Sequence, residues 1–254
     1  MRLEGKRAVI TGGAKGCGRA AALLFAKEGA SVAILDIDDA NGSRVCEEVA
    51  SSGRPSLYHS TDVSRAEMVD AAISDIAAKW GGIDILLNHA GIVMVKAFDE
   101  MDASEWTHMF ETNVLSMVHA TKAALPHMLS AGGGAIVNTA SISGLTASSF
   151  QSAYCTTKGA CIQFTRSIAV EYRDRHIRCN AVSPGFIDTD HGRREVAWLS
   201  ELETGSPEED IAQSQGRMCT PEEVAQVMLF LASDDASFVN GECLVVDNTA
   251  MART

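Results

Sequence analysis

The chain has 254 residues, of which 46% are hydrophobic and 21% are charged, so the apolar content is sufficient for one sizeable core. The formal net charge of −12 argues against nucleic acid or an anionic membrane surface as a partner. No segment approaches about 18 uninterrupted apolar residues, and the N-terminus lacks a signal-peptide pattern. We therefore expect a cytoplasmic protein that has no membrane partner.

Seven cysteines are scattered along the chain without a C-x-x-C pair. A disulfide framework or a zinc site would need clustered spacing. This distribution predicts reduced thiols and no bound metal.

Short aliphatic runs alternate with segments of helical spacing along almost the whole chain. The runs expected to form strands are 7–11, 31–36, 57–60, 83–88, 135–139, 178–183 and 244–246, and the main helical segments are 18–28, 41–51, 65–80, 104–129 and 152–173. No Pro- or Ser-rich linker interrupts this alternation. The pattern predicts an α/β fold, a doubly wound, Rossmann-like parallel sheet with helices on both faces, in a single domain covering 1–254.

The alternation is broken by a long polar stretch between Ser183 and Thr220. A connection of this length in a compact domain is usually a functional lid or a disordered loop, and we expect a substrate lid at about 186–216. The sequence from Thr220 then has a helix N-cap, a proline at the first helical position and a capping-box glutamate, which predicts a helix through Leu231.

Two helical segments, 104–129 and 152–173, carry apolar residues beyond one stripe. A helix with one wetted side should show a cleaner polar face. We expect both segments to lose their outer face to a subunit contact.

A glycine-rich turn, Thr11-Gly12-Gly13-Ala14-Lys15-Gly16-Cys17-Gly18, follows the first strand and opens a helix. Glycines at such a turn let the backbone approach a pyrophosphate, whose charge lies at the helix N-terminus. The spacing differs from the common G-x-G-x-x-G fingerprint, so the turn alone is a weak signal, and its strand-to-helix context strengthens it.

Asp36 ends the second strand, where a carboxylate can accept both hydroxyls of an adenosine ribose and repel a 2′-phosphate. Lys15 favours the opposite choice, because a cation beside the ribose could accept that phosphate. Since a carboxylate both binds NAD and rejects NADP, we predict NAD as the cofactor.

Tyr154 and Lys158 are four residues apart and share one helix face. A free phenol has a pKa of about 10, and lowering it by about three units takes about 4 kcal/mol. The ammonium and a positive nicotinamide ring could supply that energy, so that the tyrosinate removes a hydroxyl proton as hydride leaves the carbon. Tyr-x-x-x-Lys alone is usually a surface pair.

Other polar groups follow strand ends. Ser141 follows the strand at 135–139, Asn88-His89-Ala90-Gly91 closes the fourth strand, and Pro184-Gly185 closes the sixth. The carboxyl ends of parallel strands form a binding crevice, and the Ser141 hydroxyl there could bond the reacting oxygen.

These motifs together resemble the short-chain dehydrogenase/reductase family, in its shorter single-domain branch. The resemblance runs from Lys6 to about Asp247, and it is carried by Thr11-Gly12…Gly16-x-Gly18, Asp62-Val63, Asn88-x-Ala90-Gly91, Asn113, Ser141, Tyr154-x-x-x-Lys158 and Pro184-Gly185-x-x-x-Thr189. It implies a catalytic set of Asn113, Ser141, Tyr154 and Lys158, in which Asn113 holds a water that links Lys158 to solvent.

The resemblance also implies the cofactor contacts. Asp62 would meet the adenine amino group and Val63 its ring, Asn88 and Gly91 would shape the floor of the site, and Ile187 and Thr189 would fix the carboxamide. The full predicted cofactor set is Gly12, Lys15, Gly16, Cys17, Gly18, Asp36, Ile37, Asp62, Val63, Asn88, Ala90, Gly91, Tyr154, Lys158, Pro184, Gly185, Ile187 and Thr189. Members of this family are often homotetramers, which agrees with the subunit contact expected above.

Three positions depart from the family pattern. His89 replaces a frequent second asparagine, Cys17 stands where an aliphatic residue is usual, and Asp247-Asn248-Thr249 replaces Asp-Gly-Gly. We expect the first to be harmless and the last to change the C-terminal tail.

The candidate substrate residues are largely apolar. They are Ser141, Ser143, Gln151, Met94, Phe186 and Trp198, with Val93 and Ile142 beside them. This set predicts a hydrophobic or cyclic secondary alcohol or ketone as the small-molecule partner. Arg193 and Arg194 could hold a carboxylate or phosphate, although basic residues in an acidic loop are more often solvated.

Two alternatives stay open at this point. One is an NAD(P)H-dependent ketone or 3-oxoacyl reductase of the same family. The other is a non-catalytic NAD-binding sensor or scaffold, which would not need Asn113, Ser141, Tyr154 and Lys158 together.

Overall fold

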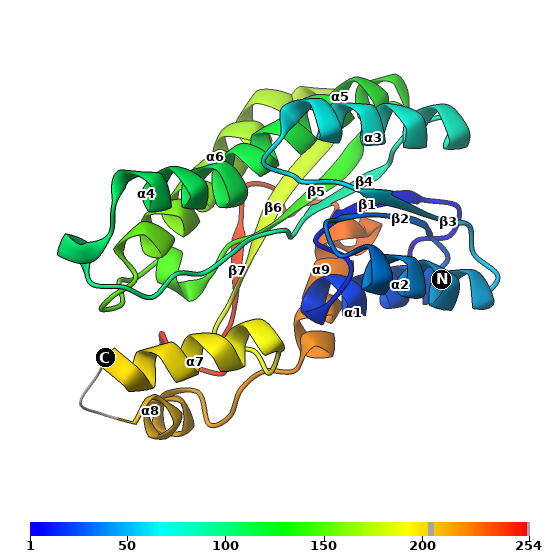
Figure 1. Ribbon diagram of the computed structural model, residues 1–254. Coiled ribbons are helices and arrows are strands. Elements are labelled where there is room, and N and C mark those ends of the chain that lie inside the picture. The colour runs from blue at the N-terminus through cyan, green and yellow to red at the C-terminus, as the bar shows by residue number, and fades with distance from the viewer. Residues whose placement is uncertain (203–205, 253–254) are drawn as a thin grey trace.

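The seven strands of the computed structural model, which describes residues 1–202 and 206–252, form one parallel sheet. They are β1 (Arg7–Thr11), β2 (Ser31–Asp36), β3 (Ser56–Ser60), β4 (Ile85–Asn88), β5 (Gly134–Thr139), β6 (Ile177–Pro184) and β7 (Cys243–Val246). The order across the sheet is β3-β2-β1-β4-β5-β6-β7, with every neighbouring pair parallel (Figure 1). This is the doubly wound sheet predicted from the sequence.

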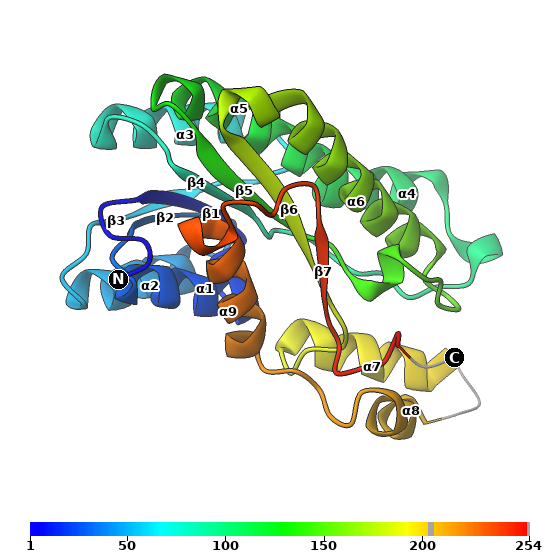
Figure 2. The same cartoon turned by 180° about the vertical axis from the view of Figure 1, so that it is seen from behind.

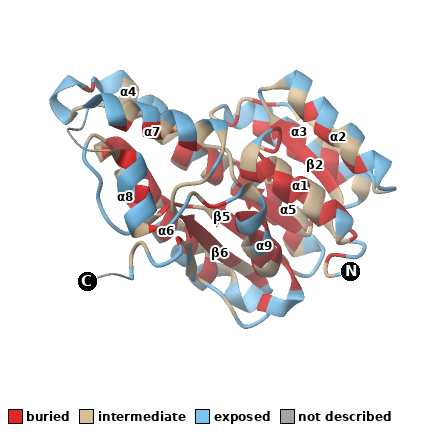
Figure 3. Cartoon of the chain, turned by 90° about the horizontal axis from the view of Figure 1, so that it is seen from below, coloured by how far each residue is buried: buried red, intermediate tan, exposed pale blue. Residues whose placement is uncertain are grey.

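The central strands are buried on both faces, which explains why their sequences are continuous apolar runs. β1, β2 and β4 consist almost entirely of buried residues, whereas the edge strands β3 and β7 are only partly buried. Figure 3 shows the buried residues gathered in the sheet and on the helix faces turned toward it.

Helices cover both faces of the sheet (Figures 1 and 2). On one face lie α1 (Gly16–Lys27), α2 (Asp39–Ser51) and α9 (Pro221–Ala232), which share one core cluster. On the other lie α3 (Ala66–Trp80), α5 (Ser116–Ser130) and α6 (Ser152–Tyr172). The remaining helices are α4 (Ala103–Phe110), α7 (Asp190–Leu202) and α8 (Pro207–Ser214), with short helical turns at Phe98–Glu100, Ile142–Gly144, Arg173–Arg175 and Asp234–Ala236.

The helix expected at 104–129 is confirmed over residues 103–130, but its regular spacing is interrupted. A π-helical turn, η2 (Glu111–Leu115), separates α4 from α5. Such a turn adds a residue to the helical spacing and often occurs at functional sites. Its central residue, Asn113, is buried.

The polar stretch between Ser183 and Thr220 is not the loop that the sequence analysis allowed for. It contains two helices, α7 and α8. α7 buries Gly192, Val196 and Leu199, which recur at helical spacing, and α8 begins with the N-cap Ser206 and a proline. The helix expected after Thr220 is confirmed as α9, including its capping box.

Much of the apolar excess on the segment 104–129 is used inside the chain. Among its apolar residues, five are buried in the described structure: Met109, Met117, Ala124, Leu125 and Met128. The apolar pattern of the segment 104–129 therefore overestimated how many apolar residues remain exposed for contact with a second subunit. No helix of the described residues is both long and apolar enough to cross a membrane.

The C-terminal departure from Asp-Gly-Gly keeps a glycine-like backbone. Asn248 has φ 46° and Thr249 has φ 76°, both in the left-handed region. Asn tolerates this region, whereas a β-branched threonine is strained there. Asp247 holds the turn by accepting hydrogen bonds from the backbone N–H groups of Thr249 (3.1 Å) and Met251 (2.7 Å).

An ion pair joins β1 to the segment before β4 at the amino ends of the strands. Arg7 donates to both carboxylate oxygens of Asp84, at 2.7 and 2.8 Å, and its backbone N–H donates to the same carboxylate at 2.8 Å. Burial alone would raise the pKa of Asp84, but the hydrogen bonds and charge of Arg7 outweigh it and lower the pKa. Both side chains are about four-fifths buried, so solvent screens the pair only in part.

Asp84→Asn should lower the free energy of unfolding by about 2 kcal/mol at neutral pH, because it removes charge-assisted hydrogen bonds from a guanidinium. A carboxyl with a lowered native pKa contributes stability above its unfolded pKa and loses it as the pH falls through the native value. The difference between the two proteins should therefore shrink in acid. Urea unfolding at neutral pH and below about pH 4 measures it.

The control is Asp174→Asn, which breaks the exposed pair with Arg173 and should change stability by less than about 0.5 kcal/mol. If the difference in the free energy of unfolding between D84N and the parent protein stays constant with pH, the lowered pKa of Asp84 does not contribute to stability as we expect.

Candidate active site at the carboxyl end of the sheet

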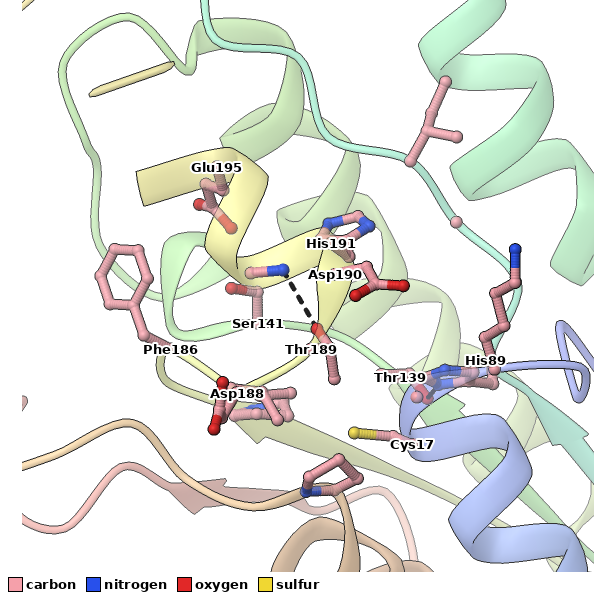
Figure 4. A pocket seen from close by; sticks show the side chains of 18 of the residues that line it. Cys17, His89, Thr139, Ser141, Phe186, Asp188, Thr189, Asp190, His191 and Glu195 are labelled. Carbon is pink, nitrogen blue, oxygen red and sulfur yellow. Dashed lines mark hydrogen bonds between the residues drawn. The ribbon is translucent and has the colours of Figure 1, made fainter. Parts of the chain in front are cut away.

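A cavity lies where the strand order reverses, between β1 and β4. Its volume is about 760 Å³, within the usual range for a small-molecule site. It is lined by the turn after β1, the ends of β4, β5 and β6, the start of α6 and the start of α7. Figure 4 shows side chains from these segments around it.

The turn after β1 requires its glycines. Gly12 has φ 71° and Gly16 has φ 51°, where other residues are strained. A Cβ on Gly12 would lie 2.8 Å from the backbone of Ala90, and one on Gly18 would collide with the carbonyl of Gly12. These glycines hold β1, β4 and α1 close together, and Ala90 takes part in that close approach.

The N-terminus of α1 points unpartnered donors into the cavity. Its N-cap, Lys15, makes no side-chain cap, and the first turn contains no acidic residue. By contrast, α4 and α9 both have complete capping boxes. Because Lys15, Gly16 and Cys17 line the cavity, the free N–H groups and the helix dipole suit a pyrophosphate there. The uncapped N-terminus of α1 is therefore suited to the pyrophosphate of a dinucleotide.

Asp36 is held at the end of β2. Its carboxylate accepts hydrogen bonds from the backbone N–H groups of Ala14 (2.9 Å) and Asp38 (3.0 Å). Lys15 is engaged by a 2.6 Å salt bridge to Asp38. In the sequence, Asp36 favours NAD and Lys15 favours NADP. The structure distinguishes the two residues, because the Lys15 ammonium already has an anionic partner. Ile37 is 74% exposed beside them.

Asp62 and Val63 follow β3 at the same edge of the sheet. Asp62 accepts hydrogen bonds from the backbone and hydroxyl of Ser64, and Val63 is buried. Neither lines the cavity as it stands.

The floor below the cavity is a buried polar network. The Asn88 amide donates to Asn138 Oδ1 at 2.8 Å and to Thr121 Oγ1 at 3.2 Å. Thr11 Oγ1 accepts from the backbone N–H groups of His89 and Ala90. Asn88 therefore shapes the site from below, and Gly91 lines it directly.

Tyr154 and Lys158 lie on one face of α6, and both are buried at the cavity wall with Ser141. Lys158 Nζ is 5.6 Å from the centre of the Tyr154 ring and donates to the Thr139 carbonyl at 2.8 Å. Ser141 Oγ accepts from the backbone N–H of Ser143 at 3.1 Å.

In the protein alone the pKa of Tyr154 is raised, and its acidification beside a bound positive nicotinamide ring stays a prediction. Burial raises the pKa of its phenol well above the ordinary value, the Glu195 carboxyl adds to the rise, and the Ser141 hydrogen bond acts against it. Burial also lowers the pKa of Lys158. Desolvation disfavours both charged forms, and within the protein alone it exceeds the effect of their proximity.

Asn113 stands behind these residues. Its amide oxygen accepts from the backbone N–H of Ile92 at 2.8 Å, and its nitrogen donates to the Ile92 carbonyl at 2.9 Å and to Thr157 Oγ1 at 3.1 Å. A Cβ on Gly91 would lie 3.2 Å from Asn113 Oδ1 and 3.7 Å from Lys158 Nζ. Asn113 and Lys158 therefore flank the same small space. Its water-holding role stays a prediction.

The segment after β6 lines the opposite wall with Pro184, Gly185, Phe186, Ile187 and Thr189. Thr189 Oγ1 accepts from the backbone N–H of Gly192 at 3.0 Å, the bond drawn in Figure 4.

Gln215, which the sequence analysis missed, clamps this segment from the end of α8. It is 2% exposed, accepts from the Phe186 N–H at 3.0 Å and donates to the Phe186 carbonyl at 2.8 Å. Nothing local in the sequence distinguishes this glutamine from a surface residue.

The predicted substrate residues divide into two groups. Ser141, Ser143 and Phe186 line the cavity. Met94 and Trp198 instead pack on the apolar cluster that includes Tyr154 and Val93, and Gln151 is buried next to the cavity. Arg193 is paired with Asp188 at 2.6 Å, and Arg194 lies over the Trp198 ring at 5.6 Å.

The cavity wall also contains His89, His191 and Glu195, ionisable residues that were not assigned any role from the sequence. Burial lowers the pKa of His89 to about 3 and that of His191 to about 4. The His89 ring fits because Gly18 has no side chain, since a Cβ there would lie 2.8 Å from His89 Cδ2. His89 is therefore coupled to the glycine turn. Only the helical spacing of α7 could have shown that His191 and Glu195 share a face.

Comparison with known proteins gives consistent matches over the whole chain. A family model described as enoyl-(acyl carrier protein) reductase matches residues 12–248. The meso-2,3-butanediol dehydrogenase of Serratia marcescens is 38% identical, over 99% of this chain and 97% of that protein. The cyclohexanol dehydrogenase of an Acinetobacter strain is 36% identical, over 97% and 95%, and the 3-oxoacyl-(acyl-carrier-protein) reductase of Chlamydia muridarum is 36% identical, over 96% and 97%.

Solved structures agree. The crystal structure of levodione reductase covers 100% of both chains with a TM-score of 0.94 and 31% identity. With the parallel sheet, the glycine turn and the Tyr154–Lys158 pair in place, these matches show that the chain belongs to the short-chain dehydrogenase/reductase family.

Proposed function

We propose that this protein is an NAD-dependent oxidoreductase that transfers a hydride between the nicotinamide and a hydrophobic or cyclic secondary alcohol or its ketone. One observation carries the proposal. A buried phenol and ammonium form one wall of a cavity, and the uncapped N-terminus of α1 opens into the same cavity. A non-catalytic NAD sensor would need only the second feature.

In this site NAD supplies the hydride acceptor and a positively charged ring. Tyr154 takes the hydroxyl proton of the alcohol, and in reverse returns it to the forming alkoxide. Ser141 hydrogen-bonds the reacting oxygen, and Lys158 stabilises the phenolate electrostatically. Lys158 and Asn113, which flank one small space, then pass the proton toward solvent. α7 closes the cavity on the side of Phe186 and limits the entry of water.

The choice of NAD rests on Asp36 and its surroundings. The three cations at that end of the cavity, Lys15, Arg19 and Arg44, each lie within 4 Å of a carboxylate of Asp38 or Glu48. Among the described residues that line this end of the cavity, a 2′-phosphate would therefore meet Asp36 without an unpaired cation to offset the repulsion.

The names of the relatives support alcohol substrates, and they also support the alternative of a 3-oxoacyl reductase. Two of them are named for oxidation of butanediol and cyclohexanol, and another for reduction of a 3-oxoacyl carrier protein. A panel of secondary alcohols with NAD, and 3-oxoacyl thioesters with NADPH, followed at the nicotinamide absorbance, separates these activities. If the protein turns over neither class of substrate, the non-catalytic NAD-binding sensor becomes the better interpretation.

Tyr154→Phe should reduce kcat for the best alcohol by about a thousandfold, because it removes the proton acceptor while keeping the ring. NADH fluorescence should show unchanged binding. Tyr172→Phe, at the other end of α6, is the matched control and should retain full activity. Undiminished turnover in Y154F would overturn the assigned role.

Asp36→Ala should lower the ratio of kcat/KM with NAD to that with NADP by about a thousandfold, since repulsion between unit charges is worth about 4 kcal/mol at about 4 Å and an effective dielectric near 20. Glu47→Gln removes an exposed charge on α2 and should leave the ratio unchanged. A wild-type preference for NADP would reject the cofactor assignment.

The proposal includes a homotetramer. Val170 on α6 is 77% exposed and Phe238 is fully exposed, and the chain after Phe238 contacts α6, where a Cβ on Gly241 would lie 3.4 Å from Ala169. Exposed apolar residues on neighbouring segments are typical of a subunit contact. Light scattering at micromolar concentration should give the mass of four chains, and Val170→Asp with Phe238→Ser should reduce it. A monomeric parent would refute the assembly.

A further inference from the structure

Glu195 is an acidic residue in the reaction cavity for which the catalytic set has no use. It lies in the second turn of α7 and lines the cavity together with Ser141 and Tyr154. Figure 4 shows its side chain extending from α7 on the side of the cavity where Ser141 lies. Burial raises the pKa of the Glu195 carboxyl, whereas the hydrogen bond from Gln151 and the charge of Lys158 act against that rise.

Gln151 fixes the position of this carboxyl. Its amide Nε2 donates to Glu195 Oε1 at 2.7 Å, and the glutamine itself is 1% exposed. Gln151 is the N-cap residue of α6, three positions before Tyr154. The helix that carries the phenol therefore also sets where the Glu195 carboxyl stands relative to it.

The carboxyl has little other compensation for its burial. Among residues 1–202 and 206–252, Gln151 is the only group that donates it a hydrogen bond, and no cation lies within 4 Å of it. The two arginines on the same helix are directed elsewhere, Arg193 to Asp188 and Arg194 to the Trp198 ring. A partly buried carboxyl with one donor has acceptor capacity left over for a further hydrogen bond.

We propose that Glu195 determines specificity by accepting a hydrogen bond from a second hydroxyl group of the substrate, so that the preferred substrates are neutral diols or hydroxyketones. This inference rests on the proposed oxidoreductase function and names its substrate class. The reacting carbinol meets Ser141 and Tyr154, while the second hydroxyl reaches the carboxyl that Gln151 holds. A substrate that carries a carboxylate at that position meets a like charge in a site of low dielectric and is rejected.

The test compares three probes of one ring size: vicinal cyclohexanediol, cyclohexanol and a hydroxycyclohexanecarboxylate. Wild type should prefer the diol to cyclohexanol by about tenfold or more in kcat/KM, as expected for a buried site built to bond a substrate hydroxyl. Glu195→Ala should lower the ratio of diol to cyclohexanol by about tenfold. Glu195→Gln should raise the ratio of the carboxylate substrate to cyclohexanol by about tenfold, because the like charge is gone.

Binding gives a second measurement that does not depend on turnover. In the non-reacting complex with NADH, quenching of the nicotinamide fluorescence should show that E195A weakens diol binding about tenfold relative to wild type. Glu201→Gln removes a carboxylate from the exposed face of the same helix and is the matched control, which should change none of these ratios. A gain with the anionic substrate cannot come from a damaged fold.

The outcomes separate the two proposals. If alcohols are oxidised but both ratios stay within about twofold of wild type in E195A and E195Q, the role of Glu195 is rejected and the oxidoreductase function stands. If wild type oxidises no alcohol with NAD or NADP, both are rejected.

Discussion

All seven strands point the same way, and this shared direction makes the site possible. Each strand delivers the residues that follow it to one edge of the sheet: the glycine turn after β1, Asp36 on β2, and Ser141 after β5. Where the order reverses between β1 and β4, the two neighbouring connections cross to opposite faces and leave a crevice. Groups that are more than a hundred residues apart in the chain therefore meet without a second domain.

Burial works against the chemistry of this crevice before a cofactor arrives. It raises the pKa of Tyr154 and lowers that of Lys158, so burial disfavours the charged form of each side chain in the protein alone. The same low dielectric strengthens any charge introduced later, because the interaction energy varies inversely with the dielectric constant. An arriving positive ring therefore acts on the phenol more strongly than it would in water. The reactive state of the tyrosine is thus linked to occupancy of the neighbouring subsite.

Local pattern predicted the sheet, the glycine turn and the helix after Thr220, because each depends on residues adjacent in sequence. It could not predict features that depend on tertiary contacts. Gln215 clamps Phe186 from thirty positions away, and Gln151 meets Glu195 across two elements. The helix α7 was missed for a different reason: its buried residues recur at helical spacing, but the polar composition of the stretch hid them. The raised pKa of Tyr154 in the protein alone could not be predicted, because burial cannot be read from spacing.

The π-helical turn at Glu111–Leu115 gives the segment between α4 and α5 an unusual sensitivity. It turns Asn113 inward, where the amide forms a reciprocal pair of hydrogen bonds with the backbone of Ile92. Each residue of a regular helix advances the chain by about 100°, so shortening the turn by one position would swing the whole of α5 around its axis relative to α4. In this stretch the number of residues is more tightly constrained than their identity, and length variation is the change that this part of the chain tolerates least.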